Sequence, residues 1–181
     1  MDNSVKNINE ILIEQCRRGD RIAQFRLYRQ FSKAMYNLAY RFMNNREDAE
    51  DMLQEAFIDC FRNIRSYRSE STFGQWLKRI LINRCINHLR KKKTDLLYLE
   101  NVPETSDEEL TESILDTKAV FDGIEMLPDG YRIILTLHLL EGYSHSDIAG
   151  LLGISESTSK SQYSRAKSRL RTILKNNLRY G

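Results

Sequence analysis

Hydroxyl and cationic side chains share one face of a helix that the sequence predicts near the C-terminus. Apolar residues between Tyr163 and Leu174 recur at spacings of three and four, which marks the buried side of this helix. The opposite side presents small hydroxyls among cations: Ser157, Lys160, Ser161, Ser164, Arg165, Ser168 and Arg171. Such groups bind base edges and phosphates in the major groove of duplex DNA. The pattern therefore favours a DNA-reading helix, although two solvated helices of a bundle would also present a polar face.

The residues before this helix predict the turn that would position it. Ser144 and Asp147 have the spacing of a capping box, so a short helix should begin there and end at Gly153. Ser155 is then expected to cap the DNA-reading helix. The short helix should bury four apolar residues: Ile148, Ala149, Leu151 and Leu152. Two helices joined by a tight turn are typical of a helix-turn-helix.

A second candidate surface combines aromatic and cationic side chains. A polar loop, residues 65–72, precedes a predicted helix that begins at Phe73 and turns cations and amides outward. The outward residues are Lys78, Arg79, Asn83, Arg84, Asn87, His88 and the basic run 90–93. Aromatic rings beside cations suit the unstacked bases of single-stranded nucleic acid. Phe73 and Trp76 can also belong to the core, and we expect most of Trp76 to do so with one edge facing DNA.

Acidic side chains cluster on one helix of an otherwise basic segment. Residues 46–64 carry an unbroken apolar stripe at helical spacing. The other side of this helix is predicted to expose Glu47, Asp48, Glu50, Asp51, Gln54, Glu55 and Asp59. The helix dipole stabilises acids in the first turn, so some of them need no function. A negative patch this isolated nevertheless suggests contact with a protein rather than with nucleic acid.

Three further helices are predicted before the acidic one. The first ends at Gly19, and its inner face should hold Ile8, Ile11, Leu12 and Cys16. Asp20 is expected to cap the second. The inner face of the second should hold Ala23, Leu27, Tyr28 and Phe31. The third continues through Leu38, Ala39 and Phe42 to the pair Asn44-Asn45.

Composition and charge divide the chain into three parts. The 181 residues include two prolines and eight glycines, and apolar residues recur at helical spacing, which predicts an all-α protein. Residues 1–93 hold 19 basic and 11 acidic side chains, residues 94–117 hold none and 8, and residues 118–181 hold 9 and 6. We expect two small helical domains, 1–93 and 118–181, joined by an acidic flexible linker, 94–117. The linker either aids solubility alone, or it occupies a cationic channel or repels DNA until a partner moves it.

Several classes of protein are disfavoured. The longest apolar run, residues 133–140, has eight residues, so we expect no membrane insertion and a cytoplasmic protein. Cys16, Cys60 and Cys85 lie far apart in apolar helical patterns and are expected to be reduced core residues. The histidines have no metal-ligand spacing to the cysteines, and no glycine-rich phosphate loop occurs. We expect no metal, no other cofactor and no catalytic residues, and so no enzyme.

Two sets of motifs resemble those of bacterial extracytoplasmic-function sigma factors, group 4 of the sigma-70 family. Residues 48–57, 61–68 and 72–84 (DAEDMLQEAF, FRNIRSYR and TFGQWLKRILINR) resemble sigma region 2. Residues 127–132, 142–149 and 157–167 (LPDGYR, GYSHSDIA and STSKSQYSRAK) resemble sigma region 4. Both sets occur in the right order and together cover nearly the whole chain, which is far more specific than either set alone.

The resemblance implies a sigma factor that binds core RNA polymerase, recognises promoters, melts the −10 element and starts transcription. The residues implied to dock on the clamp helices of the polymerase are Asp48, Glu50, Asp51, Gln54 and Glu55. Those implied to bind the single-stranded −10 element are Arg62, Arg65, Ser69, Ser71, Thr72, Phe73, Trp76, Lys78, Arg79, Asn83 and Arg84. Those implied to read the duplex −35 element are Ser157, Lys160, Ser161, Ser164 and Arg165. The helix around residues 133–140 would face the polymerase flap, and a separate anti-sigma factor is a family expectation.

Two positions depart from the family pattern, and one other class of protein remains open. A buried aliphatic residue usually stands at the position of Ser159, and an apolar or aromatic residue often stands at that of Ser164. The −35 sequence preference of relatives therefore does not carry over. The alternative is a stand-alone helix-turn-helix regulator, which predicts tight binding of duplex DNA by the isolated chain. That alternative leaves the acidic patch and the aromatic, basic surface without a purpose.

Overall fold

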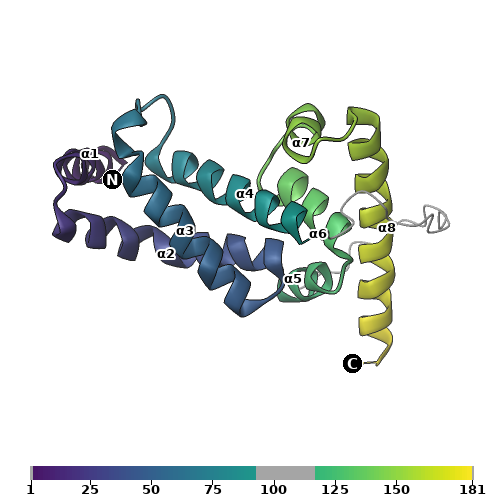
Figure 1. Ribbon diagram of the computed structural model, residues 1–181. Coiled ribbons are helices and arrows are strands. Elements are labelled where there is room, and N and C mark those ends of the chain that lie inside the picture. Colours follow the sequence, from purple (N-terminus) through teal and green to yellow (C-terminus); the bar gives the residue numbers. More distant parts are fainter. Residues whose placement is uncertain (1, 93–116, 181) are drawn as a thin grey trace. The chain divides into compact units, whose positions relative to one another are not determined.

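The described part of the chain is built from helices (Figure 1). A computed structural model describes residues 2–92 and 117–180, with side chains for residues 9–92 and 117–176. The chain divides into two compact units, Met1–His88 and Leu89–Gly181. No strand occurs within the described ranges, and the all-α prediction is confirmed. Apart from Thr117, the predicted linker lies outside the described residues, as does Lys93 of the basic run, so the predicted domain boundaries stay a prediction.

Residues 2–91 form four α-helices and one short 3-10 turn. These are α1 (Asp2–Arg17), α2 (Arg21–Met43), α3 (Arg46–Arg62), η1 (Ile64–Ser66) and α4 (Phe73–Lys91). The carboxylate of Asp20 accepts hydrogen bonds from the backbone N–H groups of Ile22 and Ala23 at 2.8 and 3.2 Å, so the predicted cap of α2 is confirmed. Asn44 ends α2 in the left-handed conformation, with φ 49°, and the Asn45 side chain caps α3.

Two predictions about these helices are wrong. α2 is one continuous helix of 23 residues, whereas the periodicity predicts separate helices on either side of Phe31. Neither Gly nor Pro occurs between Arg21 and Met43, so nothing interrupts the helical hydrogen bonds. Ile11, predicted to be buried, is 55% exposed, because Leu12, Ile13 and Cys16 occupy the buried side of α1.

A capping box that the sequence analysis missed starts α4. The N–H of Gln75 donates to Oγ1 of Thr72 at 3.3 Å, and Oε1 of Gln75 accepts from the N–H of Thr72 at 3.1 Å. An aromatic cluster of Phe31, Tyr67, Phe73 and Trp76 packs behind this turn. The hydroxyl of Tyr67 donates to the carbonyl of Ser71 at 2.6 Å, which closes the loop between η1 and α4.

The second unit surrounds its last and longest helix. It contains α5 (Thr117–Glu125), α6 (Asp129–Leu135), a π-helical turn η2 (Thr136–Leu140), α7 (His145–Leu152) and α8 (Glu156–Tyr180). α8 packs against α5, α6 and α7. The core consists of Ile124, Leu127, Tyr131, Leu135, Ala166, Leu170 and Leu174. A Cβ at Gly123 would lie 2.8 Å from Cδ1 of Leu170, so glycine at this position allows the close approach of α5 to α8.

α7 and α8 form the predicted helix-turn-helix. Oγ of Ser144 accepts from the N–H of Asp147 at 3.1 Å, and the carboxylate of Asp147 accepts from the N–H of Ser144 at 3.3 Å, so the capping box is confirmed. Gly153 ends α7 with φ 70°, and Oγ of Ser155 accepts from the N–H of Thr158 at 3.0 Å at the start of α8. Ile148 is buried, as predicted. The other three apolar residues that were predicted to be buried on α7 are only half-buried, because the helix is short. Those residues are Ala149, Leu151 and Leu152.

Candidate functional site

The predicted acidic face lies along α3. Asp51, Gln54 and Glu55 are exposed, whereas Asp48 and Glu50 are half-buried. Glu50 pairs with Arg46 at 2.9 Å, and this pairing raises the pKa of the Arg46 guanidinium. Oδ1 of Asp48 lies 3.6 Å from Nε2 of His88 on α4. α3 therefore presents a negative strip to solvent that is centred on Asp51, Gln54 and Glu55.

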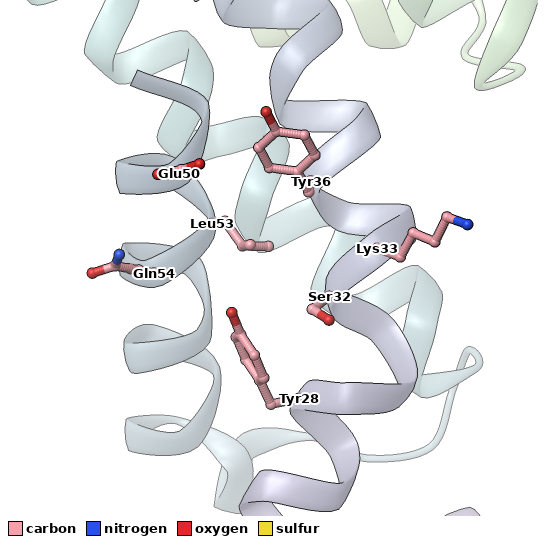
Figure 2. A pocket seen from close by; sticks show the side chains of 7 residues that line it. All are labelled: Tyr28, Ser32, Lys33, Tyr36, Glu50, Leu53 and Gln54. Atoms are coloured by element: carbon pink, nitrogen blue, oxygen red, sulfur yellow. The ribbon is translucent and has the colours of Figure 1, made fainter. Parts of the chain in front are cut away.

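A groove of about 400 Å³ runs beside this strip, between α2 and α3 (Figure 2). α2 lines it with Tyr28, Ser32, Lys33 and Tyr36, and α3 lines it with Glu50, Leu53 and Gln54. In Figure 2 the two tyrosine rings lie on either side of Leu53, and Lys33 extends away from α3. Tyr28, predicted to point inward, is 36% exposed at this groove, because Leu27 takes the fully buried position. Spacing alone does not reveal the groove, since both tyrosines fit either side of an amphipathic helix.

Arg84 makes ion pairs across the first unit. Its guanidinium pairs with the carboxylate of Asp59, and Nη1 lies 3.3 Å from Oε2 of Glu55. Asp59 also lies 3.8 Å from Nη1 of Arg62. Arg84 therefore joins α4 to the C-terminal half of α3, which leaves less of its charge available for a phosphate than the resemblance implies.

A polar pocket of about 280 Å³ opens next to this ion pair. α3 and the turn after it line the pocket with Asp59, Asn63 and Ser66, and α4 lines it with Trp76, Ile80, Asn83, Arg84 and Asn87. Asn83 and Asn87 are exposed and lie four residues apart, so both amides face the same space. Trp76, Asn83 and Arg84 were predicted to act together, and the structure brings them together here. The contribution of Asn63 was missed, whereas Ser66 lies in the loop, and Asn87 on the outward face of the helix, that the sequence predicted to bind single-stranded nucleic acid.

The other residues predicted for single-stranded DNA are spread over the loop and the outer side of α4. Arg62, Arg65, Ser69 and Arg79 are exposed, and Ser71 and Lys78 are half-buried. Thr72 is exposed but caps α4. Phe73 is 3% exposed within the aromatic cluster, so its ring supports the loop and does not face solvent. Ser69 adopts φ 60°, a left-handed conformation at the tip of the loop.

The predicted duplex-reading face is present at the start of α8. Ser157, Lys160, Ser161 and Ser164 are exposed, and Arg165 is half-buried. Nζ of Lys160 lies 2.7 Å from Oε1 of Glu156, and this ion pair lowers the pKa of Glu156. The hydroxyl of Ser161 donates to the carbonyl of Thr158 at 3.0 Å. The cations and hydroxyls thus share one side of the second helix, as the spacing predicts.

One polar contact inside the helix-turn-helix was not predicted. Ser159, which stands where the family usually has an aliphatic residue, is fully buried. Its hydroxyl lies 2.9 Å from Nδ1 of His145 on α7. The sequence indicates Ser159 only as a departure from the family pattern, and it does not reveal a contact between residues 14 positions apart.

Neither a cluster of metal-ligating side chains nor a membrane-spanning helix occurs among the described residues. Across residues 2–92 and 117–180, no group of three His, Cys, Asp or Glu side chains could hold a metal ion. None of the helices in these ranges combines the length and the apolar character needed to cross a bilayer.

Comparisons with known proteins match both units. Residues 27–94 match the family described as "Sigma-70 region 2", and residues 118–170 match "Sigma-70, region 4". The chain is 34% identical over 157 residues to the ECF RNA polymerase sigma factor SigM of Mycobacterium tuberculosis, covering 86% of this chain and 79% of that protein. It is 33% identical to the ECF RNA polymerase sigma-E factor of Haemophilus influenzae, covering 88% and 91% of the two chains. It is 30% identical to SigW of Bacillus subtilis, covering 90% and 95%.

Two solved structures share the fold. The first is the sigma factor RpoE in complex with the anti-sigma factor NepR from Bartonella quintana, with a TM-score of 0.55, 24% identity and coverage of 83% of this chain and 95% of that chain. The second is CnrH in complex with the cytosolic domain of CnrY, with a TM-score of 0.53, 20% identity and coverage of 93% and 97%. At these identities the likeness concerns the fold alone.

Proposed function

The chain belongs to the extracytoplasmic-function RNA polymerase sigma factors and directs transcription initiation, and we propose that its two units divide promoter recognition between them. The first unit docks on core polymerase and captures the melted −10 strand. The second unit reads the −35 duplex. A stand-alone helix-turn-helix regulator is not favoured, because the family match covers both units.

The acidic strip of α3 is the proposed docking site for the clamp helices of core polymerase. Asp48, Glu50, Asp51, Gln54 and Glu55 form its negative side, and the neighbouring groove adds tyrosine rings and Leu53. A docking surface needs an apolar anchor as well as charge, since charges mainly steer the encounter and fix its register. The groove supplies such an anchor site beside the acids.

The polar pocket between α3 and α4 is the proposed site for an extruded base of the −10 strand. Amides of Asn63, Asn83 and Asn87 can donate to and accept from the Watson–Crick edge of a base, and Trp76 offers a ring face. The exposed Arg62, Arg65, Arg79 and the half-buried Lys78 would hold the neighbouring phosphates. Ser69 and Ser71 would add hydroxyls, while Thr72 and Phe73 keep the loop in place. In this proposal Arg84 braces the pocket through Asp59 and contacts the strand only at its edge.

The exposed face of α8 is the proposed reader of the −35 duplex. Ser157, Lys160, Ser161, Ser164 and Arg165 lie within three turns of the N-terminus of α8, the part of a recognition helix that enters the major groove. On binding DNA, Lys160 would leave its ion pair with Glu156 and contact a phosphate or a base edge instead. The helix around residues 133–140 would face the polymerase flap.

A separate anti-sigma factor is the proposed regulator, and the cytoplasm the proposed compartment. Both structural neighbours were solved with a second protein, named as an anti-sigma factor in one case. Polymerase and promoter DNA both lie in the bacterial cytoplasm, so a protein that joins them must act there. We assign the chain no catalytic role.

The observation that supports this proposal is that one chain holds an acidic strip, an amide-lined pocket and a helix-turn-helix. Its test is promoter selection by purified core polymerase from a pool of bacterial DNA fragments. With the chain present, a defined subset of fragments should be enriched over polymerase alone. Equal enrichment with and without the chain would refute the proposal.

A further inference from the structure

Three rings meet where η2, α7 and α8 come together. The imidazoles of His138 and His145 stack with their centroids 4.2 Å apart and their planes 17° from parallel. The ring of Tyr163 lies edge-on to both, at 4.5 and 5.5 Å. These contacts join η2 to both helices of the helix-turn-helix at a single point.

The hydrogen bonds of this cluster define its chemistry. Nδ1 of His138 lies 2.8 Å from the carbonyl of Tyr143, and because a carbonyl only accepts, Nδ1 of His138 carries the proton. Nδ1 of His145 lies 2.9 Å from the fully buried hydroxyl of Ser159. A buried hydroxyl without a partner costs about 1 to 3 kcal/mol, so Ser159 depends on His145.

We propose that His145 is a positioning residue for −35 recognition, which fixes α7 against the recognition helix α8 through its hydrogen bond with Ser159. This inference rests on the proposed function of α8. His145 itself need not touch DNA. It sets the angle between the two helices, and the proposed DNA-reading residues Ser157 and Lys160 lie on either side of Ser159 in the chain.

The charges around His145 oppose its protonation. His138 faces it from η2, and Glu156, Lys160 and Tyr163 face it from α8, with Nζ of Lys167 5.1 Å from the Tyr163 ring. Lys160 already pairs with Glu156, and Asp147, on the same helix as His145, is held by Ser144. Burial lowers the pKa of His145, and the nearby His138 and Lys160 lower it further, against a smaller opposing effect of Glu156.

The direction of the pH effect follows from this lowered pKa. In the docked state, α7 packs on α8 through His145 and Ser159. A histidine whose pKa is lower in the docked state than in the undocked state stabilises the docked state at pH values above its ordinary pKa, about 6.5. The stabilisation is lost as the pH falls through the lower pKa of the docked state. Promoter binding should therefore weaken on acidification.

The test measures promoter affinity of the full holoenzyme at pH 7.5 and pH 6.0, on a fragment taken from the selection described above. The wild-type chain should lose affinity at pH 6.0, by at most about fourfold, the limit set by an ordinary histidine pKa of about 6.5. His145→Asn, whose amide can reach Ser159 without taking a proton, should keep affinity at pH 7.5 and show no such loss. Ser159→Ala should bind more weakly than wild type at pH 7.5. Ser146→Ala, an exposed change on the same helix, is the control and should follow the wild-type profile.

Two further readouts separate this role from misfolding and from polymerase binding. In the free wild-type chain, NMR should show His145 titrating below the ordinary histidine range. Binding of the chain to core polymerase should be equal at both pH values. An identical pH response of His145→Asn and wild type, or full affinity of Ser159→Ala at pH 7.5, would overturn the inference while leaving the proposed function intact. Absence of promoter selection at both pH values would instead overturn the proposed function and this inference with it.

Discussion

At the scale of single residues, Arg84 changes the account of the −10 surface. The resemblance implies a phosphate contact for this arginine, but its guanidinium pairs with Asp59 and Glu55 on α3. Asp59 is largely buried, whereas Arg84 and Glu55 are partly exposed. Solvent screening therefore keeps the stabilisation small, and the main consequence of the pair is the shape of the neighbouring pocket.

Removing the charge of Asp59 tests this bracing role. Asp59→Asn should lower the free energy of unfolding by about 1 kcal/mol and weaken binding of the holoenzyme to a melted −10 strand, because Arg84 would turn into the pocket. Urea unfolding and binding of a fork-shaped promoter fragment check the two effects. Asp122→Asn, at an exposed position on α5, is the matched control. Unchanged binding of the fragment by Asp59→Asn would show that Arg84 does not shape the pocket.

The three cysteines lie in the core, as predicted from their apolar surroundings. Burial raises the pKa of the Cys16 thiol to about 11 and that of the Cys60 and Cys85 thiols to about 12. Because the folded state favours the protonated thiols, their contribution is complete below the unfolded pKa of about 8.5 and is lost as the pH rises above it. Stability in urea should therefore fall between pH 7.5 and 9.5. Iodoacetamide should modify the native thiols slowly at pH 8 and the unfolded thiols quickly, and fast native labelling would contradict this burial.

At the scale of elements, local capping chemistry was predictable and long-range pairing was not. Asp20, Ser144 and Ser155 cap the helices that their spacing predicts, because a cap involves residues only two or three positions apart. The division of α2 near Phe31 was predicted wrongly, since periodicity alone does not mark a helix end. The pair Arg84 and Asp59 spans 25 residues, and no local pattern encodes such a contact.

The capping box of α7 offers a direct test at this scale. Ser144→Ala should lower the free energy of unfolding of the second unit by about 1 kcal/mol, because it removes the acceptor for the N–H of Asp147. Thermal unfolding followed by circular dichroism measures the change. Ser146→Ala lies two residues further along and outside the cap, and should have little effect. Equal stability of the two variants would mean that the capping box does not stabilise α7.

Charge reversal on α3 tests the proposed docking strip. Asp51→Lys should weaken binding to core polymerase about tenfold, because Asp51 is exposed at the centre of the strip. Asp122→Lys makes the same charge change on the second unit and should bind as wild type. Fluorescence anisotropy of the labelled chain with purified core polymerase checks both. Undiminished binding by Asp51→Lys would show that the polymerase docks elsewhere.

At the scale of the whole molecule, the charge pattern and the two units suggest why a scaffold is needed. The net charge of +3 is small, and residues 94–117 hold eight acids and no bases. Two small units joined by a segment this acidic should bind DNA weakly without a scaffold that positions both. Polymerase would hold both and so raise the effective concentration of each at its promoter element.

The family and the polar face of the recognition helix could be predicted from the sequence. The two motif sets indicated the family, and the spacing placed cations and hydroxyls on one face of α8. The amide pocket, the tyrosine groove and the contact of His145 with Ser159 needed coordinates, because each joins side chains from different helices.

Run-off transcription with purified core polymerase tests whether the chain directs initiation at promoters through both the −10 and the −35 element. Three templates are compared: a selected promoter, the same promoter with its −10 element replaced, and the same promoter with its −35 element replaced. We expect a product from the intact promoter, none after replacement of the −10 element and a strongly reduced amount after replacement of the −35 element. Equal product from all three templates, or no product that depends on the chain, would contradict this expectation.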